Sequence, residues 1–213
     1  MRVPRTFVFV DISGFTNFTN ENGDDAAGRL LASWRAVTRD VASETGVRIA
    51  KWLGDGCMLV AVDQRDAVRF CLELQKRSAS ACAPLSIRVG IASGLALLFE
   101  GDDYIGTAVN LAARLCDAAA SYEVIIPVDQ IENLPEGVVA VPHEPLTLRG
   151  LNEAINVVTL TGEATDVARN DTGELWTRSP FVMSLSPSAT HTDSLVRSNR
   201  ENGTWLSCPM HLC

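Results

Sequence analysis

Apolar residues recur with two different periods along most of the chain. A continuous apolar run over residues 6–12 predicts a buried central strand. From residue 24 or 25 to about residue 44 the apolar positions follow helical spacing, and Gly46 is expected to end that helix. Residues 47–53 then alternate and residues 57–62 are apolar. Because Gly-Asp-Gly joins these two segments, they predict a β-hairpin.

Shorter elements fill the next part of the chain. Asp66 is expected to open a second helix, and a loop at residues 101–106 precedes a third helix at about residues 107–120. The remaining apolar segments predict strands at residues 87–99, 123–127, 138–141, 146–148 and 155–160. Antiparallel hairpins mixed with helices in this order predict an α+β fold. The expected architecture is a ferredoxin-like, split βαβ antiparallel sheet with helices packed on it.

Composition limits the class of protein. The 213 residues are 46% hydrophobic and 21% charged, which is enough to bury the core of one domain with an extension. A formal net charge of −8 argues against a protein that binds nucleic acid or an anionic membrane surface. No apolar run has the length of a membrane span and no signal peptide is recognisable, so we expect a cytoplasmic protein without a membrane partner. The six cysteines lack framework spacing and are expected to be reduced.

The pattern changes near residue 162. Residues 162–213 are rich in Ser and Thr and keep no apolar period, so we expect a catalytic domain at residues 1–161 and a poorly ordered tail at residues 162–213. Cys208, His211 and Cys213 resemble half of a zinc site. Because a structural zinc site needs four ligands, we do not expect metal there.

Lys51 is the most unusual position of the predicted hairpin. Strict alternation places it on the same strand face as Val47, Ile49 and Leu53. Burying an ammonium group on an apolar face is costly without a partner, so a ligand or a partner chain is expected there. Asp55, at the hairpin tip, is by itself better explained by ordinary turn chemistry.

Two carboxylates are expected to meet at one edge of the sheet. Asp11 ends the first strand and Asp55 tips the hairpin, so their side chains converge if the two strands pair. Hard oxygen ligands at that density suit Mg²⁺ or Mn²⁺ bound together with substrate phosphates. One capping Asp and one turn Asp explain the same residues equally well.

Asn110 and Arg114 lie four residues apart on the third helix and therefore on one face. Their neighbours are small and apolar, so a partner molecule can approach closely. An Asn and an Arg that project together suit a sugar oxygen and a phosphate, although a surface Arg beside a satisfied Asn is the simpler explanation for this pair alone. Asp103 lies in a Gly-flanked acidic loop, where a solvated carboxylate is the default.

Three segments together resemble the catalytic domains of class III nucleotidyl cyclases. They are Phe-Val-Asp-Ile-Ser-Gly-Phe-Thr at residues 9–16, Lys-Trp-Leu-Gly-Asp-Gly at residues 51–56, and the segment from Asp103 to Arg114 that contains Asn110. The similarity runs from about residue 6 to residue 160 and leaves the tail uncovered.

The resemblance implies a role for each residue of these segments. Asp11, Asp55 and the backbone carbonyl of Ile12 would bind two Mg²⁺ or Mn²⁺ ions. The loop formed by Ser13, Gly14, Phe15 and Thr16 would hold phosphates through backbone amides. Lys51 and Asp103 would recognise adenine, Asn110 would orient the ribose, and Arg114 would stabilise the transition state. In guanylate cyclases of this family the two base-recognising positions are typically Glu and a small residue such as Cys, and this chain has neither.

The main hypothesis from the resemblance is a homodimeric adenylate cyclase. It would convert ATP to 3′,5′-cyclic AMP and pyrophosphate in active sites shared between two chains. The alternatives are a non-catalytic cyclase-homology module that dimerises or binds nucleotide, and a cyclase that prefers GTP. A diguanylate cyclase is disfavoured, because no Gly-Gly-acidic-acidic-Phe turn stands where Gly54, Asp55 and Gly56 are found.

Overall fold

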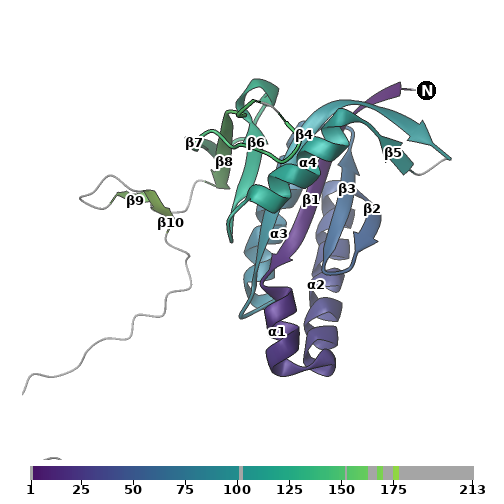
Figure 1. Ribbon diagram of the computed structural model, residues 1–213, viewed down its shortest axis with the longest axis vertical. Helices are drawn as coiled ribbons and strands as arrows, with labels where there is room; N and C mark the ends of the chain where they lie inside the picture. Colours follow the sequence, from purple (N-terminus) through teal and green to yellow (C-terminus); the bar gives the residue numbers. More distant parts are fainter. Residues whose placement is uncertain (1, 101–102, 152, 163–166, 170–174, 178–213) are drawn as a thin grey trace, which may run out of the picture. The chain divides into compact units, whose positions relative to one another are not determined.

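The computed structural model describes residues 2–100, 103–151, 153–162, 167–169 and 175–177 (Figure 1). An eight-stranded sheet has the order β2-β3-β1-β4-β6-β8-β7, with β5 paired to β4. All of its strand pairs are antiparallel except β4 with β6. The strands are β1 (Arg2–Ser13), β2 (Arg48–Leu53), β3 (Gly56–Ala61), β4 (Ser86–Phe99), β5 (Asp103–Ile105), β6 (Val124–Pro127), β7 (Val138–Pro142) and β8 (Val157–Gly162).

Helices cover both faces of this sheet, which confirms the predicted α+β, ferredoxin-like fold. The helices are α1 (Phe15–Asn22), α2 (Asp24–Thr45), α3 (Gln64–Ala81), α4 (Thr107–Ala118) and a short 3-10 helix, η1 (Val128–Gln130). Helix α4 crosses the front of the sheet and α2 and α3 lie behind it (Figure 1). The described part of the chain contains no helix long and apolar enough to cross a membrane.

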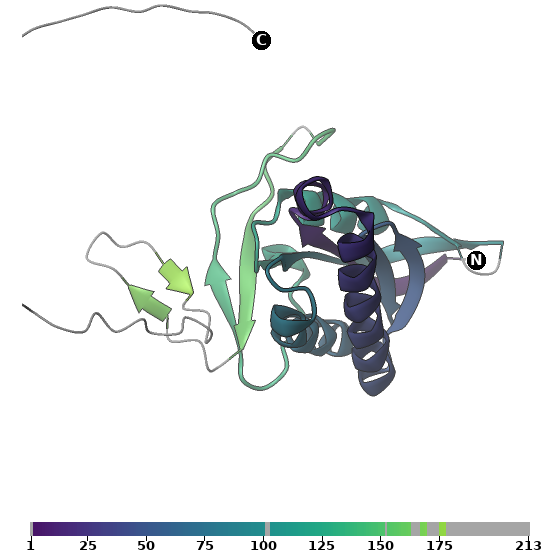
Figure 2. The same cartoon turned by 90° about the horizontal axis from the view of Figure 1, so that it is seen from below.

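Strand β1 supplies the centre of both apolar cores. Val8, Val10 and Ile12 are buried with residues of α2 and α3, which lie side by side against one face (Figure 2). Phe7 is buried on the opposite face with residues of α4. Alternation along the strand therefore sends Asp11 to the face covered by α4.

Helix α4 lies directly over β4 because that strand presents small residues to it. A β-carbon added at Gly90 would come 2.3 Å from the Ala112 carbonyl oxygen and 2.2 Å from the Cys116 nitrogen. Ala92 and Ala96 continue the same strand face and are fully buried. Any larger side chain at Gly90 would push α4 away from the sheet, so this glycine fixes the height of the helix that carries Asn110 and Arg114.

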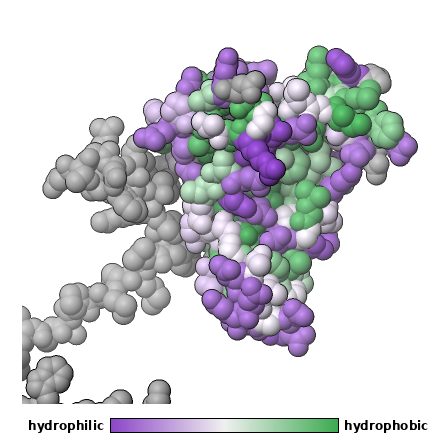
Figure 3. Space-filling view, viewed as in Figure 1, coloured by the Kyte–Doolittle hydropathy of each residue, from purple (hydrophilic) through white to green (hydrophobic). Residues whose placement is uncertain are grey.

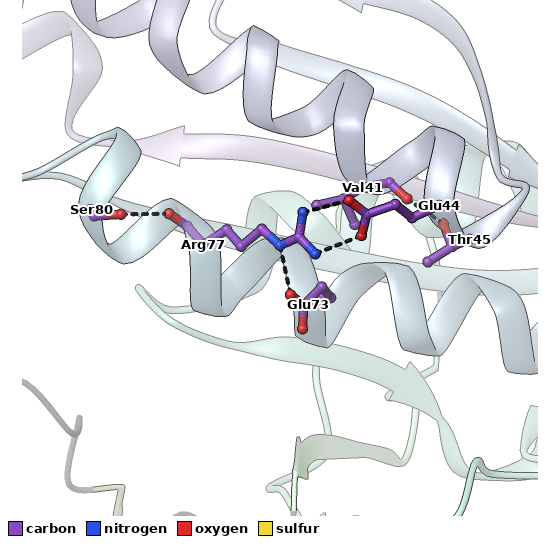
Figure 4. Close-up of polar contacts among 6 residues, drawn as sticks. All are labelled: Val41, Glu44, Thr45, Glu73, Arg77 and Ser80. Carbon is purple, nitrogen blue, oxygen red and sulfur yellow. Dashed lines mark hydrogen bonds and ion pairs between the residues drawn. The ribbon is translucent and has the colours of Figure 1, made fainter.

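On the opposite face, α2 and α3 are joined by a charged cluster. The Arg77 guanidinium donates two hydrogen bonds to Glu44 of α2, at 2.6 and 2.9 Å, and one of 2.6 Å to Glu73 of its own helix (Figure 4). These ion pairs hold the outer surfaces of the two helices together. They lie on the face of the sheet away from α4.

Several predicted boundaries were wrong. Residues 15 and 16 begin α1 and are not loop residues, and residues 103–105 of the predicted loop form β5. Helix α3 begins at Gln64, because the Asp63 side chain accepts a hydrogen bond from the Arg65 N–H and caps it. The predicted strand at residues 146–148 is reduced to one bridge between Leu146 and Ile155.

Most of the predicted tail lies outside the described residues, including Cys208, His211 and Cys213. Within it, β9 (Val167–Arg169) and β10 (Leu175–Thr177) form a two-stranded antiparallel sheet. No strand was expected there, since the sequence in that region has no sustained apolar alternation.

Candidate active site on the α4 face of the sheet

Asp11 and Asp55 meet at the edge of the sheet, as their spacing predicted. Asp11 of β1 lies opposite Gly56 of β3, and the Ile12 N–H donates a 3.3 Å hydrogen bond to the Asp55 carbonyl. A β-carbon at Gly56 would lie 2.7 Å from the Val10 carbonyl and 3.2 Å from Asp11 Oδ1. Gly56 is therefore required because it leaves room for the Asp11 carboxylate beside the turn.

Arg88 neutralises Asp11 in this structure. Its Nη2 and Nε donate hydrogen bonds of 2.7 and 3.0 Å to Asp11 Oδ2, and its Nη1 donates one of 2.9 Å to the Asp117 carbonyl of α4. Burial raises the pKa of Asp11; the hydrogen bond from Arg88 opposes this rise and the charge of Asp55 adds to it. The net shift of the Asp11 pKa is upward, and burial is its largest cause.

This donor set fits a divalent metal. Two carboxylates held at one edge, with a raised pKa on Asp11, favour an added cation of oxygen-preferring type. No group of three or more His, Cys, Asp or Glu side chains with metal-binding geometry occurs among the described residues. Further ligands would therefore come from the Ile12 carbonyl, from substrate phosphates and from water.

Lys51 does not share a face with Ile49, so the predicted phase of β2 was wrong. Ile49 pairs with Leu59 and Lys51 pairs with Met58, so Ala50 is an additional residue without a partner, a β-bulge. Leu59 belongs to the core under α2 and α3, whereas Met58 belongs to the core under α4. The bulge thus turns Lys51 to the α4 face, the same face as Asp11.

On that face Lys51 is paired with Asp103. The Lys51 Nζ lies 2.9 Å from Asp103 Oδ1, and the Tyr104 N–H donates a 2.8 Å hydrogen bond to the same oxygen. The hydrogen bond from Lys51 lowers the pKa of Asp103, and the bond from Tyr104 adds to the effect. Tyr104 is itself fixed by an edge-to-face contact with Phe7 and a 3.2 Å hydrogen bond from Arg48.

Asn110 and Arg114 line a pocket of about 270 Å³. Its walls come from α4, from β4, from Gln130 after β6 and from the segment before β8, with the lining residues Ser93, Gly94, Thr107, Ala108, Asn110, Leu111, Arg114, Gln130, Leu151 and Ile155. Gly150 lies against the Arg114 guanidinium at φ +78°, and a β-carbon there would be 3.2 Å from Arg114 Nη2. The two predicted helix residues therefore face one concave surface.

The carboxylate pair and this pocket are built from different elements of the fold. Helix α4 covers β4, and β1 and β3, which flank the Asp11–Asp55 edge, stand to one side of β4 in the sheet. The pocket walls formed by Gln130, Leu151 and Ile155 belong to the β6–β8 side. The structure brings the predicted residues to one face of the sheet but does not bring all of them to one point.

Known proteins with the same architecture identify the domain. The chain is 35% identical over 147 residues to an uncharacterized protein of Mycobacterium tuberculosis, covering 69% of this chain and 38% of that protein. It is 32% identical over 126 residues to an adenylate cyclase of Streptomyces coelicolor, covering 59% of this chain and 33% of the relative. The crystal structure of the adenylyl cyclase CyaB from P. aeruginosa matches with a TM-score of 0.67 and 25% identity, over 79% of this chain and 98% of that one.

These similarities support the assignment of the chain as a class III nucleotidyl cyclase domain. No protein-family model matches it. The chain spans little more than a third of the length of the curated relatives named above.

The loop that follows Asp11 in the cyclase domain is shorter than the sequence predicted. Gly14 takes φ +82° and precedes the first turn of α1, which Phe15 and Thr16 open. The amides of a first helical turn have no partner within the helix and face an anion favourably. The Ser13 Oγ is buried and has no hydrogen-bond partner among the described residues.

Two residues of the cyclase domain were missed by the sequence argument. Arg88 sits in an apolar alternating strand, and only the pairing of β1 with β4 places it beside Asp11. Thr107 lines the pocket with Asn110 and Arg114. Thr107 lies three residues before Asn110, and residues with this spacing share a helix face, so its place could have been predicted from the sequence.

Proposed function

We propose that the domain is an adenylate cyclase that forms 3′,5′-cyclic AMP and pyrophosphate from ATP. The observation that carries the choice of ATP is the ion pair between Lys51 and Asp103. An adenine edge offers an acceptor at N1 and a donor group at N6, and an ammonium beside a carboxylate complements them in order. The relatives named adenylate cyclase and adenylyl cyclase support the same choice.

The other residues supply the remaining parts of the reaction. Asp11, Asp55 and the Ile12 carbonyl would hold two Mg²⁺ or Mn²⁺ ions, which would supply a lowered pKa of the ribose 3′-hydroxyl and positive charge for the phosphates. Asn110 orients the ribose for in-line attack on the α-phosphate. Arg114 offsets the charge that develops on the transferring phosphoryl group.

The phosphate chain has two sources of binding groups near the metals. The backbone amides around Ser13, Gly14, Phe15 and Thr16 donate hydrogen bonds to the outer phosphates at the start of α1. Arg88 pairs with Asp11 in this structure, and with a metal bound to Asp11 its guanidinium would be available to the same phosphates.

We also propose a homodimer in which each active site is shared between chains. In one chain neither Asp11 nor Asp55 lines the Asn110–Arg114 pocket, and a second copy would bring the two groups together. The β4–β5 arm carries large exposed apolar side chains, which Figure 3 shows gathered at its end. They are Leu95, Leu97, Leu98, Phe99 and Ile105, and a partner chain would cover them.

A turnover assay tests the reaction. Purified protein is supplied with Mn²⁺ and either ATP or GTP, and the cyclic product is identified by mass spectrometry. We expect cyclic AMP from ATP and markedly less product from GTP. A protein that binds nucleotide without turnover is instead the non-catalytic module, and a preference for GTP contradicts the role assigned to Lys51 and Asp103.

Mixing two inactive variants tests the shared site. Asp11→Ala and Arg114→Ala homodimers are each expected to be nearly inactive. Random exchange makes about half of the dimers mixed, with one intact site of two, so roughly a quarter of wild-type activity should return. Differently tagged subunits that co-purify would demonstrate exchange, and exchange without recovered activity would rule out sharing.

We place the end of the catalytic domain at β8. The final strand of the main sheet ends at Gly162, and every residue assigned a role above lies before that point. A chain that ends at Gly162 should fold and cyclise ATP at a rate close to the full chain. An insoluble or inactive truncated protein would show that the tail belongs to the working unit.

A further inference from the structure

The turn that carries Asp55 is tied to α2 by Arg35. The Arg35 Nη2 donates a 2.6 Å hydrogen bond to the Gly54 carbonyl, and its Cζ lies 4.9 Å from the centre of the Trp52 ring. Trp52 in turn packs edge to face on Trp34, with ring centres 5.8 Å apart. Because Trp34 is fully buried, Arg35 connects the exposed tip of the hairpin to the rigid core.

Both peptide groups around Asp55 are therefore held. The Gly54 carbonyl, which precedes the Asp55 nitrogen, accepts from Arg35. The carbonyl of Asp55 itself accepts from the Ile12 N–H, which belongs to the strand of Asp11. Removal of the Arg35 bond leaves the turn held by its strand pairing and the Ile12 bond, and the spacing between the two carboxylates is no longer fixed from α2.

We propose that Arg35 is a positioning residue for the metal site, acting through the Gly54–Asp55 peptide group. The inference rests on the proposed function, since it assigns Arg35 to the carboxylates that would bind metal. Groups that orient metal ligands from outside the coordination sphere typically change metal affinity by roughly 10- to 100-fold when they are removed.

Arg39 provides a matched control on the same helix. Its Cζ lies 5.2 Å from the centre of the same Trp52 ring. Within the described part of the chain, no hydrogen bond joins the Arg39 side chain to the turn. Arg35→Met and Arg39→Met each remove a stacked guanidinium from Trp52, but only Arg35→Met removes the bond to the Gly54 carbonyl.

The direction in which Arg35→Met changes metal affinity distinguishes a displaced ligand from a lost positive charge. Loss of a cation near Asp55 would by itself strengthen the binding of a divalent metal, because repulsion between positive charges is removed. Weaker binding after Arg35→Met can therefore come only from the displaced ligand. Arg35→Lys, which keeps the charge and one flexible donor, should lie between wild type and Arg35→Met.

Mn²⁺ binding to the full chain tests the proposal. Electron paramagnetic resonance measures free Mn²⁺ as the full chain is titrated with the metal alone, because a nucleoside triphosphate would itself bind Mn²⁺. We expect Arg35→Met to weaken Mn²⁺ binding by roughly 10-fold or more, and Arg39→Met to change it by less than about two-fold. Both variants lose the contact with Trp52, and thermal unfolding should shift further in Arg35→Met, which also loses the bond to the Gly54 carbonyl.

The outcomes distinguish the two proposals. If wild type binds Mn²⁺, Asp55→Ala does not, and Arg35→Met binds as well as Arg39→Met, the role of Arg35 is wrong and the proposed function stands. If wild type binds no Mn²⁺ and forms no cyclic product, both proposals fail. If Arg35→Met does not fold, Arg35→Lys is compared with Arg39→Met instead. Mn²⁺ binding that is several-fold weaker in Arg35→Lys supports the positioning role of Arg35. Equal Mn²⁺ binding overturns it.

Discussion

Asp11 and Asp103 are each paired with a basic side chain, and their pKa values nevertheless shift in opposite directions. The Asp11–Arg88 pair is 27% and 28% exposed, and burial together with Asp55 raises the pKa of Asp11. The Asp103–Lys51 pair is 42% and 44% exposed, and the hydrogen bond from Lys51 lowers the pKa of Asp103.

The difference shows which pair is complete without a ligand. The exposed pair has one negative and one positive group, so its charges are balanced by each other and by water. The more buried edge has two carboxylates and one guanidinium, so a negative charge is left in a partly dehydrated place. The first arrangement suits an uncharged base edge, and the second suits a divalent cation.

Removing either carboxylate of the buried edge should have the largest effect. Asp11→Ala and Asp55→Ala each remove a metal ligand and little core volume, so we expect a loss of turnover beyond about 100-fold, more than loss of a supporting residue causes. Cyclic AMP formation with Mn²⁺-ATP measures it, and circular dichroism checks that the fold is kept. Near-normal activity in either variant would place the metals elsewhere.

Changing the exposed Lys51–Asp103 pair should alter the selection between ATP and GTP and leave metal binding intact. In the double variant Lys51→Glu with Asp103→Cys, the hydrogen-bond character offered to the purine edge is reversed, so most ATP turnover should be lost. We expect the ratio of ATP to GTP turnover to fall by about 10-fold or more, the change that 1.4 kcal/mol of differential binding produces.

An unrelated ion pair within α3 serves as the control for that double variant. Arg69 and Asp66 lie 3.8 Å apart and are also exposed. The matching change Arg69→Glu with Asp66→Cys should leave the ATP-to-GTP ratio unaltered. An unchanged ratio in the Lys51–Asp103 double variant would mean that other residues select the base.

Replacing Asp11 or Asp103 by the neutral isostere Asn should change the melting temperature slightly, and in opposite directions for the two pairs. Because the folded-state pKa of Asp11 is raised, its ionised form destabilises the metal-free fold, and Asp11→Asn should raise the melting temperature at pH 7. Because the pKa of Asp103 is lowered, Asp103→Asn should reduce it. We expect shifts of about 1–4 °C for a domain of this size, and scanning calorimetry without metal measures them.

The same two variants predict a pH dependence. Lowering the pH through the raised pKa of Asp11 protonates the wild-type carboxylate, so the advantage of Asp11→Asn should disappear there. The deficit of Asp103→Asn should persist to lower pH and vanish only as the pH falls through the lowered pKa of Asp103. Shifts of the same sign in both variants would show that burial does not distinguish the two pairs.

The sequence by itself determined the main elements and the chemistry-bearing residues. Periodicity placed α2, whose C-terminal cap is Gly46 in the left-handed conformation, and α4 within a few residues. Asp11 and Asp55 could be brought together in advance because each stands at the end of a local element, and chain order made those elements neighbours. Local spacing is enough for such cases.

Only the tertiary structure decided on which side the remaining site residues lie. The bulge at Ala50 reverses the face of Lys51, because one additional residue inverts a two-residue period, and strict alternation cannot reveal it. Arg88 and Arg35 reach the carboxylate edge from β4 and α2, elements remote from that edge in the sequence. Their roles depend on which strands pair and which helix packs beneath them, and these contacts form only when distant segments bury a common core.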